Sequence, residues 1–344
     1  MKLVVITQCV DAEDPALGAT VAKLRALAQR VDQLVVLALR VRQTELPSNV
    51  RVHTFDAPTQ ALRGARLLAA LAPELRRRPV AVLAHMAPIY AVVAAAATRP
   101  SRVPLLLWFT HWRASRTLWL AERASTRVLS VNARSFPMPS TKLVETGHGI
   151  EVPKELRPPR ADDGVLRMLA LGRTSPSKGL EALLDAVALL ADVPVALELR
   201  GPSLTDEERG HRAVLAAQIA AAGSTARVQL EGPVGQRDVA SVYAASDLLV
   251  NNMRAGALDK VVFEAAAAGL PVLVASDGFA PLVDGLVVPL RFAQDDAAEI
   301  AARVRGLYEL GRLERSALGA ELRARVRRSH SVEHWADEVV AAAR

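Results

Sequence analysis

Short apolar runs alternate with helical patterns through this chain. In the first half the apolar runs fall at 3–6, 34–39, 50–55, 80–85, 105–109, 128–131 and 142–145. Between several of them apolar residues recur every three or four positions, which indicates helices over 21–31, 61–75 and 90–97. Runs that are apolar throughout are typical of parallel strands buried on both faces by the helices that connect them. The pattern therefore predicts an α/β fold.

The second half repeats this alternation. Apolar runs fall at 165–171, 195–199, 228–230, 248–251 and 272–275, and helical patterns cover 180–190, about 18 residues from Asp206, 236–245, 261–268, 296–310, 312–326 and 331–343. A length of 344 residues suits two domains. The segment 151–164 carries three prolines and dense charge, as linkers do, so we place the domain boundary there.

Composition excludes several classes of protein. The single cysteine, Cys9, rules out a disulfide framework and a cysteine-based zinc site, and it suits a reducing compartment. The sequence opens without the pattern of a signal peptide. Residues 79–98 lack charged side chains over a length that could cross a bilayer, but His85, Pro88 and many alanines favour a strand, a loop and a helix instead. We therefore expect a cytoplasmic protein.

Charge is distributed unevenly along the chain. Residues 1–160 contain 23 Lys and Arg against 11 Asp and Glu, a net charge of +12, whereas the remainder carries −5. A basic first half indicates an anionic partner such as a phosphate group or a lipid surface. Arg63, Arg66 and the arginines at 76–78 predict peripheral binding at the inner face of the cell membrane. Scarce aromatic residues and the lack of a recognition module argue against nucleic acid.

The loop that follows the run 165–171 suits a phosphate group. The run ends at Gly172, and a polar turn leads into a helix that starts after Gly179. The free N–H groups and the dipole at the start of such a helix favour an anion, and Arg173 and Lys178 add two cations. The loop is not a Walker A motif, because no Ser or Thr follows the lysine for a metal. An ordinary solvated turn is the structural alternative.

Polar residues also follow strands of the first half. Asp11 lies after the first strand, His85 ends the run 80–85, and His111 follows the run 105–109. Ligands of parallel sheets bind at the carboxyl ends of the strands, although a single histidine is as often a hydrogen-bonded structural residue. The first strand lacks a Gly-x-Gly-x-x-Gly sequence, which argues against a dehydrogenase. No metal-binding motif and no nucleophile elbow is present in the sequence.

The helix predicted over 261–268 carries a candidate ligand contact. Asp259 and Lys260 lie at its start, Glu264 lies one turn inside, and Gly269 closes it. The Glu264 carboxylate could accept hydrogen bonds from two ribose hydroxyls. It could instead pair with Lys260 at i,i+4 spacing, and both interpretations stay open.

Eight short motifs are spread over the chain. The second half contains G-R-T-S-P-S-K-G at 172–179, G-P-V at 232–234, Y-A-A-S-D at 243–247 and D-K-V-V-F-E-A-A-A-A-G-L-P-V at 259–272. The first half contains T-Q-C-V-D at 7–11, H-M-A-P-I-Y at 85–90, W-F-T-H-W at 108–112 and G-H-G-I at 147–150. Together they resemble the motifs of the retaining glycosyltransferases of family 4, over essentially the whole chain.

The resemblance implies a GT-B fold of two Rossmann-like, doubly wound parallel-sheet domains that face each other across a cleft. It implies an acceptor-binding domain at 1–155, completed by a last helix at 331–344 that crosses back, and a donor-binding domain at 156–330. The implied reaction moves a sugar from a nucleotide-diphosphate donor to a glycan or glycolipid acceptor, with retention and without a metal or another cofactor. The resemblance implies that Arg173 and Lys178 bind the diphosphate, that Glu264 binds the ribose and that His111 lies near the sugar. Further implied contacts to the donor are Gly172, Gly179, Gly201, Gly256, Leu258, Asp259 and Lys260. Asp11, His85 and His148 are implied on the acceptor side.

One position departs from the family pattern. The family has two glutamates eight positions apart, and the partner position of Glu264 is Gly256. The sugar would then be held by Asp259, Lys260 or the backbone N–H groups of 256–258. Two alternatives stay open: a non-catalytic nucleotide-sugar or glycan-binding protein, which Gly256 favours, and a nucleotide-sugar epimerase, which has less support because its acid–base residues are not evident.

Overall fold

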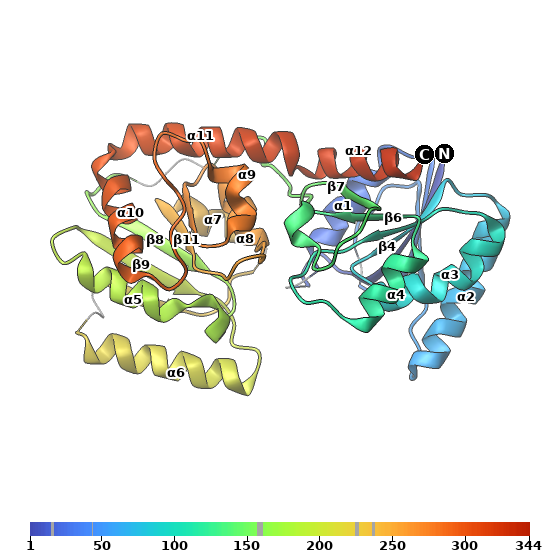
Figure 1. Ribbon diagram of the computed structural model, residues 1–344, viewed down its shortest axis with the longest axis horizontal. Helices are drawn as coiled ribbons and strands as arrows, with labels where there is room; N and C mark the ends of the chain where they lie inside the picture. The colour runs from blue at the N-terminus through green and yellow to red at the C-terminus, as the bar shows by residue number, and fades with distance from the viewer. Residues whose placement is uncertain (15–16, 43, 157–160, 224–226, 236–237) are drawn as a thin grey trace. The chain divides into compact units, whose positions relative to one another are not determined.

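Both halves of the chain form parallel sheets. The computed structural model describes residues 1–14, 17–42, 44–156, 161–223, 227–235 and 238–344. The chain divides into unit 1, Met1–Glu151 with Ser329–Arg344, and unit 2, Val152–Arg328 (Figure 1). These limits lie within a few residues of the expected ones. Residues 157–160 of the expected linker, and 236–237 of the helix expected over 236–245, lie outside the described residues.

Unit 1 contains a seven-stranded parallel sheet in the order β3-β2-β1-β4-β5-β6-β7. The strands are β1 (Lys2–Val10), β2 (Gln33–Val41), β3 (Val50–Thr54), β4 (Ala81–His85), β5 (Leu105–Trp108), β6 (Arg127–Ser130) and β7 (Leu143–Glu145). The helices are α1 (Ala19–Ala28), α2 (Gln60–Arg76), α3 (Pro88–Ser101), α4 (Arg116–Ala124) and α12 (Val332–Ala343). Val4 and Ile6 of β1 pack with apolar residues of α2, α3 and α4, whereas α1 packs against α12.

Residues 79–98 form β4 and most of α3, as expected. Within the described ranges, no helix is both long and apolar enough to cross a membrane. Helix α4 was not predicted, because only Leu118 and Ala121 of its residues are buried and Trp119 and Leu120 interrupt the polar face. Its start is fixed by Ser115, whose Oγ accepts a hydrogen bond from Leu118 N–H at 3.1 Å.

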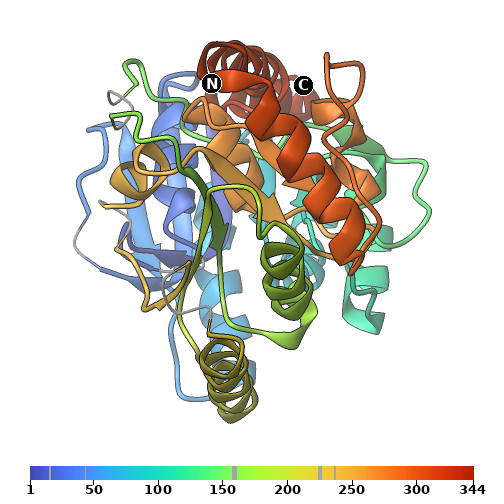
Figure 2. The ribbon, with the colours of Figure 1, turned by 90° about the vertical axis from the view of Figure 1, so that its left-hand side faces the viewer.

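Unit 2 contains a five-stranded parallel sheet in the order β10-β9-β8-β11-β12. The strands are β8 (Leu166–Leu171), β9 (Val195–Arg200), β10 (Val228–Glu231), β11 (Leu248–Asn251) and β12 (Val272–Val274). The helices are α5 (Leu180–Leu189), α6 (Asp206–Ala221), α7 (Val239–Ala244), α8 (Lys260–Ala267), α9 (Ala280–Val283), α10 (Ala297–Glu309) and α11 (Gly311–Ser329). Figure 2 shows α5 between α6 and α10, both of which it contacts.

The strand order of each sheet reverses at one point. In unit 2 the reversal lies between β8 and β11, and in unit 1 it lies between β1 and β4. The loops that leave two such strands turn away in opposite directions, which opens a crevice at their carboxyl ends. In unit 2 the loop 172–179, which follows β8, and the residues after β11 therefore border the same crevice.

The chain returns to unit 1 at the junction of α11 and α12, which the G-H-G-I motif holds. The N–H groups of Gly149 and Ile150 donate to the His330 carbonyl at 3.1 and 2.8 Å, and Val332 N–H donates to the Ile150 carbonyl at 2.8 Å. Gly147 has a φ of +70°, and a Cβ there would overlap the carbonyl oxygen of Ser329. Only glycine allows this close approach of two backbones.

Candidate functional site

The candidate site of unit 2 begins where two strand ends touch. Gly172 follows β8 and Gly201 follows β9, with φ values of +142° and +154°. Gly172 N–H donates to the Arg200 carbonyl at 2.9 Å, and a Cβ on Gly201 would overlap the Gly172 carbonyl. Gly201 needs glycine because no side chain fits between the two backbones, and Gly172 needs it because its φ disfavours any other residue. Their close packing fixes where the loop 172–179 starts.

The end of this loop presents the start of α5. Gly179 caps α5 with a φ of +55°, and in this described stretch no side chain accepts from the first N–H groups of the helix. The position of Gly179 is fixed by Asn252, whose Nδ2 donates to the Gly179 carbonyl at 2.8 Å and to Asp295 Oδ1 at 2.7 Å. The uncapped N–H groups and the helix dipole together favour an anion here.

Lys178 extends from the loop into an ion pair with Asp259. Asn251 Nδ2 donates to the same carboxylate oxygen, Oδ2, at 3.3 Å. Asp259 is the N-cap residue of α8, where an aspartate normally accepts from its own helix, but its carboxylate makes no such bond. The Asp259 carboxylate therefore binds the Lys178 ammonium and not the first N–H groups of α8.

A narrow pocket lies over these strand ends. Residues of β8, the following loop, α5, β9 and β11 line it: Ala170, Leu171, Gly172, Arg173, Thr174, Lys178, Leu180, Leu183, Arg200, Val250, Asn251 and Asn252. Asn251 is buried, and its Oδ1 has no hydrogen-bond partner among the described residues. A buried acceptor without a partner is unfavourable, so this oxygen is suited to a hydroxyl or N–H donor of a ligand.

Arg173 lies at the rim and is held by α6. Its Nη1 is 3.1 Å from Glu208 Oε1, and its side chain is 56% exposed. Glu208 is buried and accepts from Leu204 N–H at 2.7 Å. One turn further along α6, His211 Nδ1 lies 3.1 Å from the Thr174 carbonyl, and its Nε2 lies 2.7 Å from Glu181 Oε1. Helix α6 thus positions the loop through two side chains.

Glu264 forms the local ion pair that its spacing allows. Its Oε1 is 3.2 Å from Lys260 Nζ, and Tyr243 Oη donates to its Oε2 at 3.4 Å. Burial, with the negative charges of Glu264 and Asp259, raises the pKa of Tyr243 well above its usual range, so Tyr243 stays a proton donor. Nearby, Leu258 packs against Gly278, and Gly256 has a φ of +77°. The ribose contact of Glu264 stays a prediction.

Two of the predicted acceptor-side residues lie in the interior of unit 1. His85 is 4% exposed and stacks on Trp108 at 4.9 Å, and His148 lies edge-on to the same ring at 6.2 Å. Lys23 Nζ lies 4.0 Å from the centre of that ring. Burial, with the positive charge of Lys23, lowers the pKa of His85 well below its usual range, so His85 is neutral.

Asp11, the third predicted acceptor-side residue, and His111, predicted near the donor sugar, have partners of their own at the carboxyl edge of the sheet. Asp11 Oδ1 accepts from Glu13 N–H at 3.0 Å, and its Oδ2 is 3.3 Å from Arg42 Nε. His111 is exposed, stacks on Trp112 at 5.5 Å and accepts from Arg113 N–H at 3.0 Å. Among the residues that the structure describes, no group of three His, Cys, Asp or Glu side chains is placed to hold a metal ion.

Six residues of the unit 2 site were not predicted from the sequence: Glu208, His211, Tyr243, Asn251, Asn252 and Asp295. Asn251 and Asn252 had a usable signal, because two adjacent amides directly follow an apolar strand. No sequence signal pointed to Glu208 and His211, because α6 contacts the loop 172–179 only when unit 2 is folded. Asp295 lies far along the chain and meets Gly179 through Asn252.

The comparisons with known proteins agree with this geometry. Residues 166–309, which include the loop 172–179, both asparagines and α8, match the family described as Glycosyl transferases group 1. The greater part of unit 2 is thus similar to the group 1 glycosyl transferases. The predicted family resemblance is thereby confirmed for this part of the chain.

Two curated relatives align with part of this chain. A mannosylfructose-phosphate synthase of Agrobacterium fabrum is 29% identical over 115 residues, 32% of this chain and 25% of that protein. A D-inositol 3-phosphate glycosyltransferase of Streptomyces scabiei is 35% identical over 156 residues, 42% of this chain and 33% of that protein. The chain spans a quarter to a third of the length of these relatives.

A solved structure extends the similarity in fold to both units. The Anabaena protein HepE in complex with UDP and glucose superposes with a TM-score of 0.73 and covers 99% of this chain and 98% of its own, at 18% sequence identity. This likeness concerns the fold alone. The predicted GT-B fold of two Rossmann-like units is confirmed.

Proposed function

We propose that this protein is a glycosyltransferase that moves a sugar from a nucleoside-diphosphate donor to an acceptor. The observation that carries the proposal is the loop 172–179, which presents Lys178 and the uncapped start of α5 at the reversal point of the unit 2 sheet. This is where open α/β sheets bind ligands, and both features favour a diphosphate. The UDP and glucose in the structure of the Anabaena relative support a nucleotide donor.

We propose further that the reaction proceeds with retention and without a metal. Cleavage of the bond to the sugar leaves a diphosphate with growing negative charge, which Arg173, Lys178 and the dipole of α5 are suited to stabilise. The leaving phosphate would accept the proton of the attacking hydroxyl on the same face. Asn251 Oδ1 and Glu264 are the acceptors suited to hydroxyl groups of the donor.

The proposed acceptor is a lipid-linked or polysaccharide precursor, bound by unit 1. The net charge of +12 over residues 1–160 supports an anionic partner. The protein would then act in the cytoplasm, at the inner face of the cell membrane.

The test is a thermal-shift panel of uridine, guanosine and adenosine diphosphates and their sugars in the presence of a chelator. A ligand at 100 times its dissociation constant stabilises by about 2.7 kcal/mol, which is easily detected. We expect one nucleotide to shift the wild type, a much smaller shift in Lys178→Ala, and a wild-type shift in Arg209→Ala, which removes an exposed arginine paired with Asp206. No shift with any nucleotide would contradict the proposal.

A non-catalytic binding protein is the second candidate, because Gly256 offers no carboxylate to the sugar and its φ of +77° strains any other residue. Sugar release from the shifted donor distinguishes the two. An enzyme turns over, and Lys178→Ala slows it about 100-fold if one charge-assisted contact of ~3 kcal/mol is lost. Nucleotide-sugar binding with no release or transfer would favour the second candidate.

A further inference from the structure

The outer face of α4 is apolar and basic. Leu118 and Ala121 point into the core of unit 1, whereas Trp119 is 49% and Leu120 is 47% exposed. Arg116 and Arg123 are also exposed. The positions 116, 119, 120 and 123 follow the i, i+3, i+4, i+7 spacing, so these four side chains share one face of the helix. A helix that faces only water would carry polar residues there.

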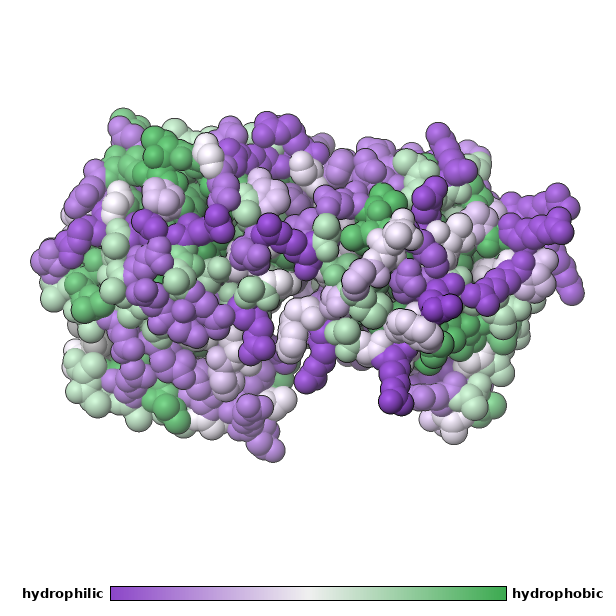
Figure 3. Space-filling view, in the orientation of Figure 1, coloured by the Kyte–Doolittle hydropathy of each residue, from purple (hydrophilic) through white to green (hydrophobic). Residues whose placement is uncertain are grey.

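The loop before α4 continues this surface. Trp112 is 43% exposed, and Arg113 Cζ lies 5.5 Å from the centre of its ring. Arg123 Cζ lies 4.8 Å from the centre of the Trp119 ring. These cation–π contacts hold guanidinium groups beside both exposed indoles. We call Trp112, Arg113, Arg116, Trp119, Leu120 and Arg123 the α4 face. Over the region of α4, Figure 3 shows pale and green atoms interleaved with purple ones.

Negative charge is directed away from the α4 face. Glu122, the one acidic residue of the α4 sequence, has a side chain that is 16% exposed. Its Oε1 accepts from Ser140 Oγ at 2.8 Å and lies 3.8 Å from Lys142 Nζ. The arginines of the face therefore act without a competing carboxylate on the same helix surface.

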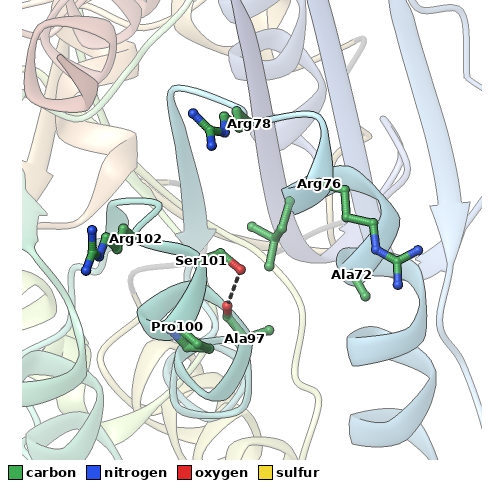
Figure 4. Close-up of a pocket in the computed structure, with 8 residues that line it drawn as sticks. Ala72, Arg76, Arg78, Ala97, Pro100, Ser101 and Arg102 are labelled. Atoms are coloured by element: carbon green, nitrogen blue, oxygen red, sulfur yellow. Dashed lines mark hydrogen bonds between the residues drawn. The ribbon is translucent and has the colours of Figure 1, made fainter.

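The basic surface continues from α4 to the ends of α3 and α2. Arg99 Nη2 donates to the Arg123 carbonyl at 3.3 Å, which joins the ends of α3 and α4. Between the ends of α2 and α3 lies an open pocket with Arg76, Arg78 and Arg102 at its rim (Figure 4). The ion pairs of the described residues include none of these three. Arg63 and Arg66, by contrast, contact Asp56.

We propose that the α4 face docks on the surface of an anionic lipid bilayer. Exposed tryptophan and leucine enter the boundary between headgroups and acyl chains, and arginine binds the lipid phosphates with several parallel hydrogen bonds. The face starts beside His111, at the carboxyl edge of the unit 1 sheet. Docking would thus bring that edge to an acceptor held in the bilayer. The proposal deepens the membrane association proposed above and moves it from Arg63 and Arg66 to α4.

The test is flotation of the full chain with vesicles of phosphatidylcholine alone and of phosphatidylcholine with phosphatidylglycerol. We expect binding to the anionic vesicles only, and binding that weakens as salt is added. The double substitution Trp119→Ser, Leu120→Ser should lower the partition coefficient more than about 10-fold. Arg116→Gln and Arg123→Gln should each lower it about 5-fold. Leu189→Ser, which removes a 55% exposed leucine on α5, is the control and should bind as the wild type.

Three outcomes would overturn the proposal: no binding by the wild type, equal binding to both kinds of vesicle, or undiminished binding by the Trp119, Leu120 double variant.

Tryptophan fluorescence gives an independent measurement, because Trp108 and Trp335 are already buried and only the emission of Trp112 and Trp119 can shift to shorter wavelengths on binding. The nucleotide thermal shift should persist in the double variant. Loss of the shift would indicate misfolding, and its absence in the wild type would concern the proposed function alone.

Discussion

Asp259 is the residue whose position bears most directly on ligand binding, because it holds the lysine that a diphosphate would need. Asp259→Asn removes this competing charge, so we expect the affinity for the nucleoside diphosphate to rise about 10-fold, in line with one hydrogen bond to a charged group. We expect sugar transfer to fall, because Asp259 is a proposed contact of the sugar. Isothermal titration with the diphosphate measures the first effect, and sugar release from the donor measures the second.

Asp192→Asn is the matched control, since it breaks the ion pair with Arg305 on the surface of the same unit. Its affinity should equal that of the wild type. A weaker affinity of Asp259→Asn for the diphosphate would mean that the carboxylate positions Lys178 for the ligand rather than competing with it.

At the scale of residues, the sequence predicted those site residues that lie close together in the chain. Gly172, Lys178 and Gly179 lie in one loop, and the prediction that they lie at a strand end followed from the apolar run before them. Their partners could not be predicted, because Asp259 and Asn252 reach the loop only once β11 pairs with β8. The ion pair itself has no signature in the spacing of the two residues.

At the scale of elements, Gly179 joins the loop to α5 and admits no side chain. Gly179→Ala would place a methyl group on Asn252 and Asp295 and force a left-handed conformation that costs alanine about 1 kcal/mol. We expect the free energy of unfolding of unit 2 to fall by about 2 kcal/mol or more, with loss of the nucleotide shift. Urea unfolding measures the change.

Gly210→Ala is the control for this substitution. Gly210 lies inside α6, and a Cβ there meets nothing within 4 Å. Alanine is the better helix former, so we expect a gain of up to about 1 kcal/mol. Equal stability of the two variants would contradict the role given to Gly179.

Elements with a long apolar face were predictable, whereas helix α4, which buries only Leu118 and Ala121, was not. The apolar runs located the strands, although β1 extends to Val10 because Thr7 and Cys9 continue its pairing with β2. Helix α4 escaped prediction because its outer face carries Trp119 and Leu120 where a water-facing helix would be polar. The membrane proposal rests on these same two exposed apolar side chains.

At the scale of the whole molecule, two buried histidines make the stability of unit 1 depend on pH. Burial, with the nearby charge of His334, lowers the pKa of His330 to about 4, and the pKa of His85 is also lowered. The unfolded chain binds a proton at each near pH 6.5, so stability falls as the pH decreases from 6.5 towards 4 and this contribution then levels off. For His330 the loss is about 3 kcal/mol.

Urea unfolding over this pH range measures the effect. His330→Gln removes one titrating group, so its stability should fall less steeply with acid than that of the wild type. The substitution His53→Gln, at an exposed position of β3, should leave the slope unchanged. Parallel slopes for the wild type and His330→Gln would contradict the assignment.

The junction of α11 and α12 also limits when unit 1 can finish folding during synthesis. Residues 329–344 belong to unit 1 but leave the ribosome only after all of unit 2. Until then the nascent unit 1 lacks Trp335, which closes over Lys23 and Trp108, and the partner helix of α1. Residues 1–151 therefore cannot complete their packing until unit 2 has been synthesised, and their uncovered face stays open to water for that interval.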